Sequence, residues 1–386
     1  MRLSKVLYFL FRHFLTILNK LLPKSEKVIV QGFPNNEGSA IEVYNYIATK
    51  KTLPVFFVID KRLMNHPGEL LIQPQLLEKS SLRFFYHYLT AKYIFFTHGS
   101  TLNSFSNKQI AVNIWHGLCY KPVGVLIGNR PIKVDLTVAT SEFTKPMFMK
   151  SFGVPYQQVV GSGYPRNDIM IREKPRKIYY KQKLKLTSFN KIMIWLPTYR
   201  KAVVGEERSD GREIGNPFYI SNFDISLFNS ILEKHNVLCM VKPHPMAPIY
   251  DNQQGQSHLK FIDDQWLSDN GLTIYHLAAV SDLLISDVSS VIADYMMMDQ
   301  PVVCVNEDFE EYKRTRGFYF DDIENWIPSR VCRSAEEFFQ YLGSILETGV
   351  DPYEEQRRKI KKFFFDHDDG KSAERVVEAA LSLVKP

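Results

Sequence analysis

The sequence lacks the patterns by which several common enzyme classes are recognised. It contains no Gly-x-Gly-x-x-Gly fingerprint, no Walker phosphate-binding loop and no Gly-x-Ser-x-Gly elbow. Their absence argues against a dinucleotide-dependent dehydrogenase, a P-loop kinase and a serine hydrolase. The chain also has no internal repeat and no low-complexity tract. Its chemistry must therefore lie in other motifs.

Cysteine is scarce, and the four residues show no Cys-x-x-Cys pairing: Cys119, Cys239, Cys304 and Cys332. All four lie in or near apolar stretches, so we expect buried free thiols in a reducing compartment and no zinc site. His244, which is discussed below, has no carboxylate and no second histidine at the usual ligand spacing. The sequence therefore predicts no bound metal and no cofactor.

No segment is apolar enough over a sufficient length to predict a spanning helix, which needs about 20 apolar residues. Residues 6–22 come nearest, but Arg12 and His13 interrupt them. No small-residue cleavage site follows, so a secretory signal is not predicted. Because Arg2, Lys5, Lys20 and Lys24 flank the stretch, we expect residues 1–24 to form an amphipathic helix on an anionic membrane surface. The alternative is a core helix whose basic residues point to water.

Length and composition indicate a soluble chain with two cores. Its 386 residues fit two domains of roughly 150 to 200 residues each. Hydrophobic residues make up 45% and charged residues 23%, while 27 Phe and 20 Tyr predict aromatic-rich cores. The net charge of +6 is too mild to indicate a nucleic-acid partner. It does fit anionic ligands or an anionic membrane surface.

Short apolar runs alternate with helix-length segments, which is typical of parallel βαβ construction. We expect one strand series at 27–31, 54–59, 93–97, 110–115 and 136–139, and a second at 192–196, 237–241, 283–286 and 302–305. The expected fold class is therefore α/β, with two Rossmann-like parallel-sheet domains facing a central cleft. Residues 25–170 form the first domain, and residues 171–386 form the second with its C-terminal helices.

Two histidines follow expected strands, at the edge where open α/β sheets bind ligands. His116 stands between Trp115 and Gly117, where a general base could work near neutral pH. The alternative for His116 is a core histidine bonded to backbone. His244 stands between Pro243 and Pro245, two residues that fix φ and hold the imidazole rigidly. That rigidity favours a functional role.

Other polar turns carry candidate phosphate ligands. Ser289 and Ser290 begin a helix after the strand at 283–286, where free N–H groups and the helix dipole attract anions. Plain N-capping is the alternative and is compatible with phosphate binding. Arg166 could reach a phosphate or tie a turn to a carboxylate, and Thr198 with Arg200 could contact a second phosphate. His98 is interpreted as structural.

Taken together, the motifs resemble those of the CDP-glycerol glycerophosphotransferases, the teichoic-acid primases and polymerases of bacterial cell-wall synthesis. The resemblance covers roughly residues 110 to 325 and is carried by Trp115-His116-Gly117 with Lys121, by 163–168, 196–200, 242–245 and 286–290 with Asp294, and by 316–320. It implies a GT-B architecture whose second domain holds the donor. It also implies a peripheral enzyme on the cytoplasmic face of the cell membrane.

Carried over by position, His116 and His244 match the family's catalytic histidines, and Ser289, Ser290 and Asp294 match its donor-binding turn. The full set of expected substrate contacts is Lys121, Arg166, Asn167, Asp168, Thr198, Arg200, Lys242, Ser289, Ser290, Asp294 and Arg316. The reaction implied is attack of an acceptor hydroxyl on the β-phosphate of CDP-glycerol, which releases CMP. The acceptor implied is a polyprenyl-diphosphate-linked saccharide or a growing polyol-phosphate chain, and no metal takes part.

Three alternatives stay open at this point. The donor could be CDP-ribitol or another CDP-alditol, or the chain could be a GT-B glycosyltransferase that uses a nucleotide sugar. A glycosyltransferase would leave a nucleoside diphosphate, so the released nucleotide separates it from a CDP-alditol enzyme. The third alternative is a membrane-surface binding protein with a degenerate site.

Overall fold

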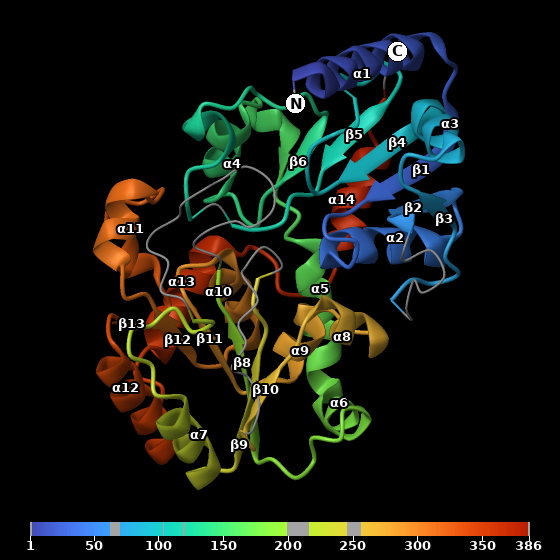
Figure 1. Ribbon diagram of the computed structural model, residues 1–386. Helices are drawn as coiled ribbons and strands as arrows, with labels where there is room; N and C mark the ends of the chain where they lie inside the picture. The colour runs from blue at the N-terminus through green and yellow to red at the C-terminus, as the bar shows by residue number, and fades with distance from the viewer. Residues whose placement is uncertain are drawn as a thin grey trace. The chain divides into compact units, whose positions relative to one another are not determined.

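A computed structural model describes residues 2–61, 70–102, 104–118, 120–198, 216–244 and 256–384, with side chains from residue 7 onward (Figure 1). The chain forms two compact units. The N-terminal unit consists of residues 1–116, 124–169 and 366–386, and the C-terminal unit of residues 117–123 and 170–365. These units differ in two places from the contiguous ranges expected from the sequence. The short segment 117–123 belongs to the C-terminal unit, and the last 21 residues belong to the N-terminal one.

The N-terminal unit is built on a seven-stranded parallel sheet in the order β3-β2-β1-β4-β5-β6-β7. Its inner strands are buried apolar runs, as parallel strands covered on both faces require. The strands are β1 Ser25–Gln31, β2 Val55–Ile59, β3 Leu76–Glu78, β4 Ala91–Phe96, β5 Ile110–Asn113, β6 Leu136–Val138 and β7 Val159–Val160. The helices are α1 Arg2–Leu21, α2 Gly38–Lys50, α3 Leu82–Thr90, α4 Lys145–Phe152, α14 Ser372–Leu381 and α5 Pro165–Glu173, which begins in this unit.

The C-terminal unit has a six-stranded parallel sheet in the order β10-β9-β8-β11-β12-β13. Its strands are β8 Lys191–Leu196, β9 Val237–Val241, β10 Leu259–Phe261, β11 Leu283–Ser286, β12 Val302–Val305 and β13 Val331–Cys332. Its helices are α6 Lys177–Lys183, α7 Ile225–Lys234, α8 Asp264–Asp269, α9 Ile274–Val280, α10 Ser290–Tyr295, α11 Phe309–Thr315, α12 Ala335–Thr348 and α13 Glu354–Phe364. The predicted α/β class with two parallel sheets is confirmed.

The core of the C-terminal unit is aromatic, as the composition predicts. Trp195 on β8 is 1% exposed and packs against Phe218, Phe228 and Phe338, with ring centroids 4.8, 5.6 and 5.2 Å away. Aromatic side chains bury more apolar area than aliphatic ones and stack with preferred geometry, so this cluster fixes α7 and α12 against the sheet. Cys239, Cys304 and Cys332 are buried and form no disulfide among the described residues, as expected, while Cys119 lies outside those residues.

The last helix belongs to the first unit because Asp168 caps it. The Asp168 carboxylate accepts hydrogen bonds from the backbone N–H groups of Ser372 and Ala373, at 2.9 and 2.8 Å. Gly163 has a positive φ of +82°, and a Cβ there would stand 2.5 Å from Ser372 Oγ. The Gly163–Asp168 motif is thus shaped to receive the start of α14, which packs beside α2 (Figure 1).

Helix α1 is held by its polar side and exposes an apolar one. Arg12 donates to the backbone oxygens of Ser100, Thr101 and Leu102 at 3.0, 3.2 and 2.8 Å, and Asn19 donates to Gln109 at 2.7 Å. The exposed stripe consists of Leu7, Leu10, Phe14, Ile17 and Leu21, each between 49% and 77% exposed. Among the described residues, no helix combines the length and the apolar character needed to cross a bilayer.

Candidate active site

The backbone turns sharply just before His116 at the carboxyl end of the N-terminal sheet. Strand β5 ends at Asn113, whose side-chain oxygen accepts a hydrogen bond from the Trp115 N–H at 3.2 Å. Trp115 takes a positive φ of 41°, which a bulky residue adopts only where its surroundings enforce it. The Asn113 amide also donates to Thr137 Oγ1 on the neighbouring strand at 3.1 Å. The turn thus sets the direction in which His116 leaves the sheet.

The hydrogen bond of His116 selects which ring nitrogen carries the proton. Nδ1 lies 3.3 Å from the backbone oxygen of Thr97. A carbonyl oxygen can only accept, so Nδ1 must be the N–H of a neutral ring, and Nε2 is then the nitrogen that can take up a proton. His116 is half-buried. The arrangement suits a general base.

A second histidine covers one face of His116. The rings of His98 and His116 are stacked with centroids 3.8 Å apart and planes inclined by 8°. The Trp115 ring lies 3.9 Å from the His116 ring at 41°. The sequence analysis interpreted His98 as structural. The signal that could have linked it to His116 is that the two strands before these histidines are neighbours in the sheet. β4 and β5 are parallel neighbours with Phe96 opposite Asn113, so the residues that follow them end level with each other.

Arg166 and Asn167 of α5 lie beneath the same turn, and both are buried. The Arg166 guanidinium donates to the backbone oxygen of His116 and lies 5.0 Å from the Tyr164 ring. Arg166 therefore helps to hold the turn that carries His116. Both polar atoms of the Asn167 carboxamide lack a hydrogen-bond partner among the described residues. Substrate contacts by Arg166 and Asn167 stay predictions, as does one by Asp168, whose carboxylate caps α14.

In the C-terminal unit, His244 follows β9 in the loop that begins at Lys242. The Lys242 N–H donates to the backbone oxygen of Trp195 on β8 at 3.0 Å, which continues the ladder past the strand end. Its side chain is only 7% exposed, and Nζ pairs with Asp264 Oδ1 of α8 at 3.1 Å. Asp264 escaped the sequence analysis because it follows a three-residue edge strand and belongs to no motif. Pro245 lies outside the described residues.

Burial keeps His244 neutral. It lowers the pKa of His244 to about 4, and the positive charges of Lys242 and Lys121 act in the same direction. Asp264 and Asp287 oppose them without reversing the shift. A neutral imidazole in this position offers an N–H donor to an anionic group rather than a full positive charge. The positive charge around His244 comes from the lysines.

Thr198 and Asp287 connect the ends of β8 and β11. The Thr198 hydroxyl donates to one carboxylate oxygen of Asp287, and the Thr198 N–H lies 3.3 Å from the other. This brings the predicted residue Thr198 to the loop that follows β11, where Ser289 caps α10 and accepts from the Val291 N–H at 3.5 Å. The predicted contact Arg200 lies outside the described residues.

Helix α10 is short and has a buried acid in its last turn. It ends at Tyr295 and continues as one 3₁₀ turn. Ser289 and Ser290 are half-buried at its start, whereas Asp294 is completely buried. The negative charge of Asp294 adds to burial in raising the pKa of Tyr120. A donor contact by Asp294 stays a prediction.

The segment 117–123, directly after His116, packs with the C-terminal unit. Lys121 Nζ lies 4.8 Å from the centre of the Tyr312 ring, and Arg316 donates to the backbone oxygen of Pro122 at 2.7 Å. The Tyr319 N–H also donates to the backbone oxygen of Tyr120 at 2.7 Å. Because Lys121 also acts on the pKa of His244, the structure brings Lys121, Lys242 and His244 into one basic cluster.

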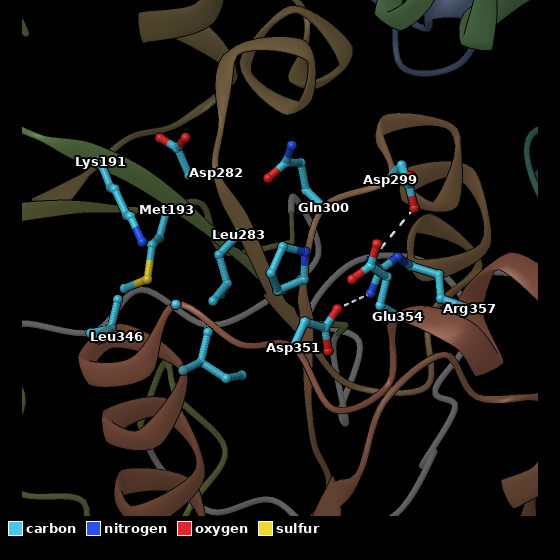
Figure 2. Close-up of a pocket in the computed structure, with 13 residues that line it drawn as sticks. Lys191, Met193, Asp282, Leu283, Asp299, Gln300, Leu346, Asp351, Glu354 and Arg357 are labelled. Carbon is cyan, nitrogen blue, oxygen red and sulfur yellow. Dashed lines mark hydrogen bonds and ion pairs between the residues drawn. The ribbon is translucent and has the colours of Figure 1, made fainter.

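Two hollows lie at the opposite, amino edges of the sheets and contain neither histidine. One of about 220 Å³ in the C-terminal unit is lined by Lys191 and Leu283, which begin β8 and β11, and by Arg357, whose charge is paired with Asp351 (Figure 2). The other, of about 850 Å³ in the N-terminal unit, is lined by residues that include Lys20 and Lys133. Ligand sites in such folds lie at the carboxyl ends of strands, so neither hollow is the candidate active site.

Comparison with known proteins points to one family. The family model described as CDP-Glycerol:Poly(glycerophosphate) glycerophosphotransferase matches residues 14–382. The chain is 27% identical over 291 residues to the teichoic acid ribitol-phosphate polymerase TarK of Staphylococcus aureus, which covers 71% of this chain and 52% of TarK. It is 24% identical over 399 residues to a teichoic acid poly(glycerol phosphate) polymerase of Bacillus spizizenii, covering 94% of this chain and 93% of that protein.

The fold is that of a solved structure in the same group. The wall teichoic acid polymerase TagF superposes with a TM-score of 0.73 at 17% identity, over 98% of this chain and 95% of that one. The chain spans about half the length of several of the curated relatives that it matches. The resemblance carried by the sequence motifs is thereby confirmed: the chain belongs to the CDP-glycerol:poly(glycerophosphate) glycerophosphotransferase family.

Proposed function

We propose that this protein transfers glycerol phosphate from CDP-glycerol to a hydroxyl of a lipid-linked saccharide or polyol-phosphate chain and releases CMP. The observation that carries the proposal is the hydrogen bond from His116 Nδ1 to Thr97 O, since it leaves Nε2 as the proton acceptor in a chain of this family. Support for the donor comes from the family description and from a variant of TagF that was soaked with CDPG.

In the proposed reaction, the acceptor oxygen forms a bond to the β-phosphorus of CDP-glycerol. The bond between that phosphorus and the bridging oxygen breaks, so CMP leaves with the bonding electron pair. His116 Nε2 takes the proton from the attacking hydroxyl, a task that contributes roughly 10² to 10⁴-fold to a rate. No other covalent step is required of the protein, because phosphoryl transfer depends mainly on positioning and on charge stabilisation.

The basic cluster of the C-terminal unit has the chemistry to stabilise the diphosphate. Lys242 and Lys121 supply positive charge, and the neutral His244 supplies an N–H donor for the departing CMP. Ser289 and Ser290 would add hydroxyl donors beside the start of α10. Thr198, Arg200 and Arg316 complete the proposed set of donor contacts. Arg166 acts mainly through the His116 backbone that it holds.

The test is CMP release from a panel of CDP-alditols, with and without a lipid-linked disaccharide acceptor. We expect acceptor-dependent CMP release with CDP-glycerol, and its loss in the His116→Ala variant. If no CDP-alditol yields CMP with any acceptor, the proposal is wrong. Release of a nucleoside diphosphate from a nucleotide sugar would instead identify a glycosyltransferase.

CDP-ribitol is the second candidate donor, because some relatives of this chain are named for ribitol phosphate. Relatives that match over 71% and 72% of this chain include a ribitol-phosphate polymerase and a ribitol-phosphate primase. The proposed donor contacts concern the diphosphate and carry no signal for the alditol. The same panel separates the two donors, since it measures CMP release from each of them in parallel.

We propose further that α1 attaches the protein to an anionic membrane surface, at the cytoplasmic face. Its exposed stripe of Leu7, Leu10, Phe14, Ile17 and Leu21 recurs every three or four residues, which places all five on one side of the helix. Residues 1–25 contain no Asp or Glu. An exposed apolar stripe in a purely basic segment has the character of an interfacial helix.

The membrane proposal is tested by flotation with vesicles that contain phosphatidylglycerol. The double variant Leu10→Asp with Phe14→Asp should lose binding, because two charges would enter the apolar layer. The matched control is Val350→Asp, which introduces a charge at an equally exposed apolar position of the C-terminal unit. Unchanged binding of the α1 double variant would disprove the attachment.

A further inference from the structure

The two histidines at the carboxyl edge of the N-terminal sheet form one stacked pair. β4 and β5 are adjacent and parallel, so His98 and His116 leave the sheet side by side. Their rings are nearly parallel, with centroids 3.8 Å apart. The His98 ring also makes a T-shaped contact with the Phe33 ring, with centroids 5.3 Å apart and planes inclined by 77°. His98 thus contacts both the loop that follows β1 and the expected proton acceptor.

Thr97 connects Phe33, His98 and His116. Its hydroxyl oxygen accepts a hydrogen bond from the Phe33 N–H at 3.0 Å and lies 3.0 Å from His98 Nδ1. Its backbone oxygen accepts from His116 Nδ1 at 3.3 Å. Because Thr97 is fully buried, it offers both imidazoles a fixed frame. The hydrogen bond to Thr97 and the His98 ring that covers one face of His116 therefore both act on the orientation of the His116 ring.

The protonation state of His98 makes the stack compatible with a charged His116. Burial lowers the pKa of His98 to about 4, so the ring is neutral at ordinary pH. A neutral ring tolerates an imidazolium stacked on it and, as an electron-rich face, attracts it. Two imidazolium rings with centroids 3.8 Å apart would instead repel each other strongly.

We propose that His98 is a positioning residue for His116: its ring holds the His116 ring in the plane and tautomer that aim Nε2 at the acceptor hydroxyl. The inference rests on the proposed function of His116 as the proton acceptor. His98 itself does not touch the substrate. Its contribution is orientation, and small displacements of a catalytic group are costly, since misplacement by about 1 Å can lower a rate by roughly 10²-fold.

The kinetic test uses three single variants. His98→Ala removes the ring and should lower kcat by roughly 10 to 100-fold with little change in the KM for CDP-glycerol. His98→Phe restores an aromatic ring without a titrating nitrogen and should recover most of kcat. The matched control is His87→Ala, which removes another histidine of the same unit that contacts an aromatic ring: His87 lies on α3, with its ring centroid 4.3 Å from that of Phe56 on β2, and its loss should leave kcat unchanged.

A second measurement reads the His116 ring without any turnover. Nitrogen-15 NMR of labelled histidine distinguishes the Nδ1–H tautomer, which the structure requires, from the Nε2–H tautomer. We expect the Nδ1–H form of His116 to dominate in the intact protein and in His98→Phe, and the Nε2–H form to increase in His98→Ala. Thermal melting of each variant shows whether it is folded.

The outcomes separate this inference from the proposed function. If His98→Ala keeps the kcat and the His116 tautomer of the intact protein, or if His98→Phe is as impaired as His98→Ala, the positioning role is wrong. If His116→Ala keeps full activity, the proton-acceptor role fails. The NMR comparison still decides whether His98 orients the ring in that case.

Discussion

The two units hold their histidines by opposite means. In the N-terminal unit, His116 lies against the uncharged ring of His98 and bonds to the backbone carbonyl of Thr97. In the C-terminal unit, His244 lies among Lys121, Lys242, Asp264 and Asp287. The hydrogen bond to Thr97 leaves Nε2 of His116 as the proton acceptor, whereas burial and the nearby lysines keep His244 neutral. On the proposed function, we expect proton uptake by His116 and hydrogen-bond donation by a neutral His244.

The largest expected effect comes from replacing each histidine by glutamine as well as by alanine. An amide can donate a hydrogen bond but cannot take up a proton at neutral pH. We therefore expect His116→Gln to be as impaired as His116→Ala, each by roughly 10² to 10⁴-fold in kcat. His244→Gln should keep clearly more activity than His244→Ala, because the amide N–H replaces the imidazole donor. CMP release under saturating CDP-glycerol measures all four.

Equal activity of His244→Gln and His244→Ala would contradict the expected difference between the two histidines, since proton transfer would then be required of His244 as well. Circular dichroism and thermal melting of the four variants serve as the control for folding. A retained affinity for CDP-glycerol in the His116 variants would further separate catalysis from donor binding.

A smaller effect should separate the stabilities of the two units. Asp168→Ala removes the cap of α14 in the N-terminal unit, where the carboxylate accepts from two backbone N–H groups. Asp224→Ala removes the equivalent cap of α7 in the C-terminal unit, where Asp224 accepts from the Ser226 and Leu227 N–H groups at 2.9 Å each. Loss of such a cap costs about 1 to 2 kcal/mol.

Hydrogen exchange resolved along the chain measures both cap variants. Asp168→Ala should raise exchange in α2 and α14, and Asp224→Ala should raise it in α7. Faster exchange across both units in either variant would mean that the units do not unfold separately.

The smallest expected effect is the change in stability of each unit at acidic pH. Burial lowers the pKa of His98 in the N-terminal unit, and of His244 and His276 in the C-terminal unit, from 6.5 to about 4. Each is neutral when folded, so its stabilising contribution is complete above pH 6.5 and is lost as the pH falls toward 4. Burial raises the pKa of Asp168 from 3.8 to about 6, so its contribution grows as the pH falls through that range.

Burial also lowers the pKa of His87 in the N-terminal unit, so the difference between the units comes from Asp168. The C-terminal unit, which lacks Asp168, should therefore weaken more than the N-terminal unit between pH 7 and pH 5. Unit-resolved hydrogen exchange at the two pH values tests this expectation. His276→Gln is a suitable control, because glutamine can keep the capping box in which His276 Nδ1 accepts from the Thr273 N–H at 3.1 Å, without titrating. It should reduce the acid sensitivity, and an unchanged response would contradict the assignment.

The sequence predicted the inner strands well because a strand buried on both faces must be a continuous apolar run, as β9 is from Val237 to Val241. It missed β3, β7, β10 and β13 because two or three residues at a sheet edge carry too little periodicity. The strand ends that carry His116 and His244 were found for the same reason as the strands. The contacts that hold His116 and the loop of His244 were not predicted. His98 and Asp264 make these contacts through strand order and register, which local patterns do not encode.

The capped helix α14 also has a consequence for how the protein is made. The N-terminal unit needs residues 366–386, whereas the C-terminal unit draws all but the short segment 117–123 from residues 170–365. Domains generally fold as units during synthesis. Here the part of the chain that leaves the ribosome first must wait with an uncovered α2 until Ser372 and Ala373 arrive at Asp168. The N-terminal unit is therefore completed after the C-terminal unit.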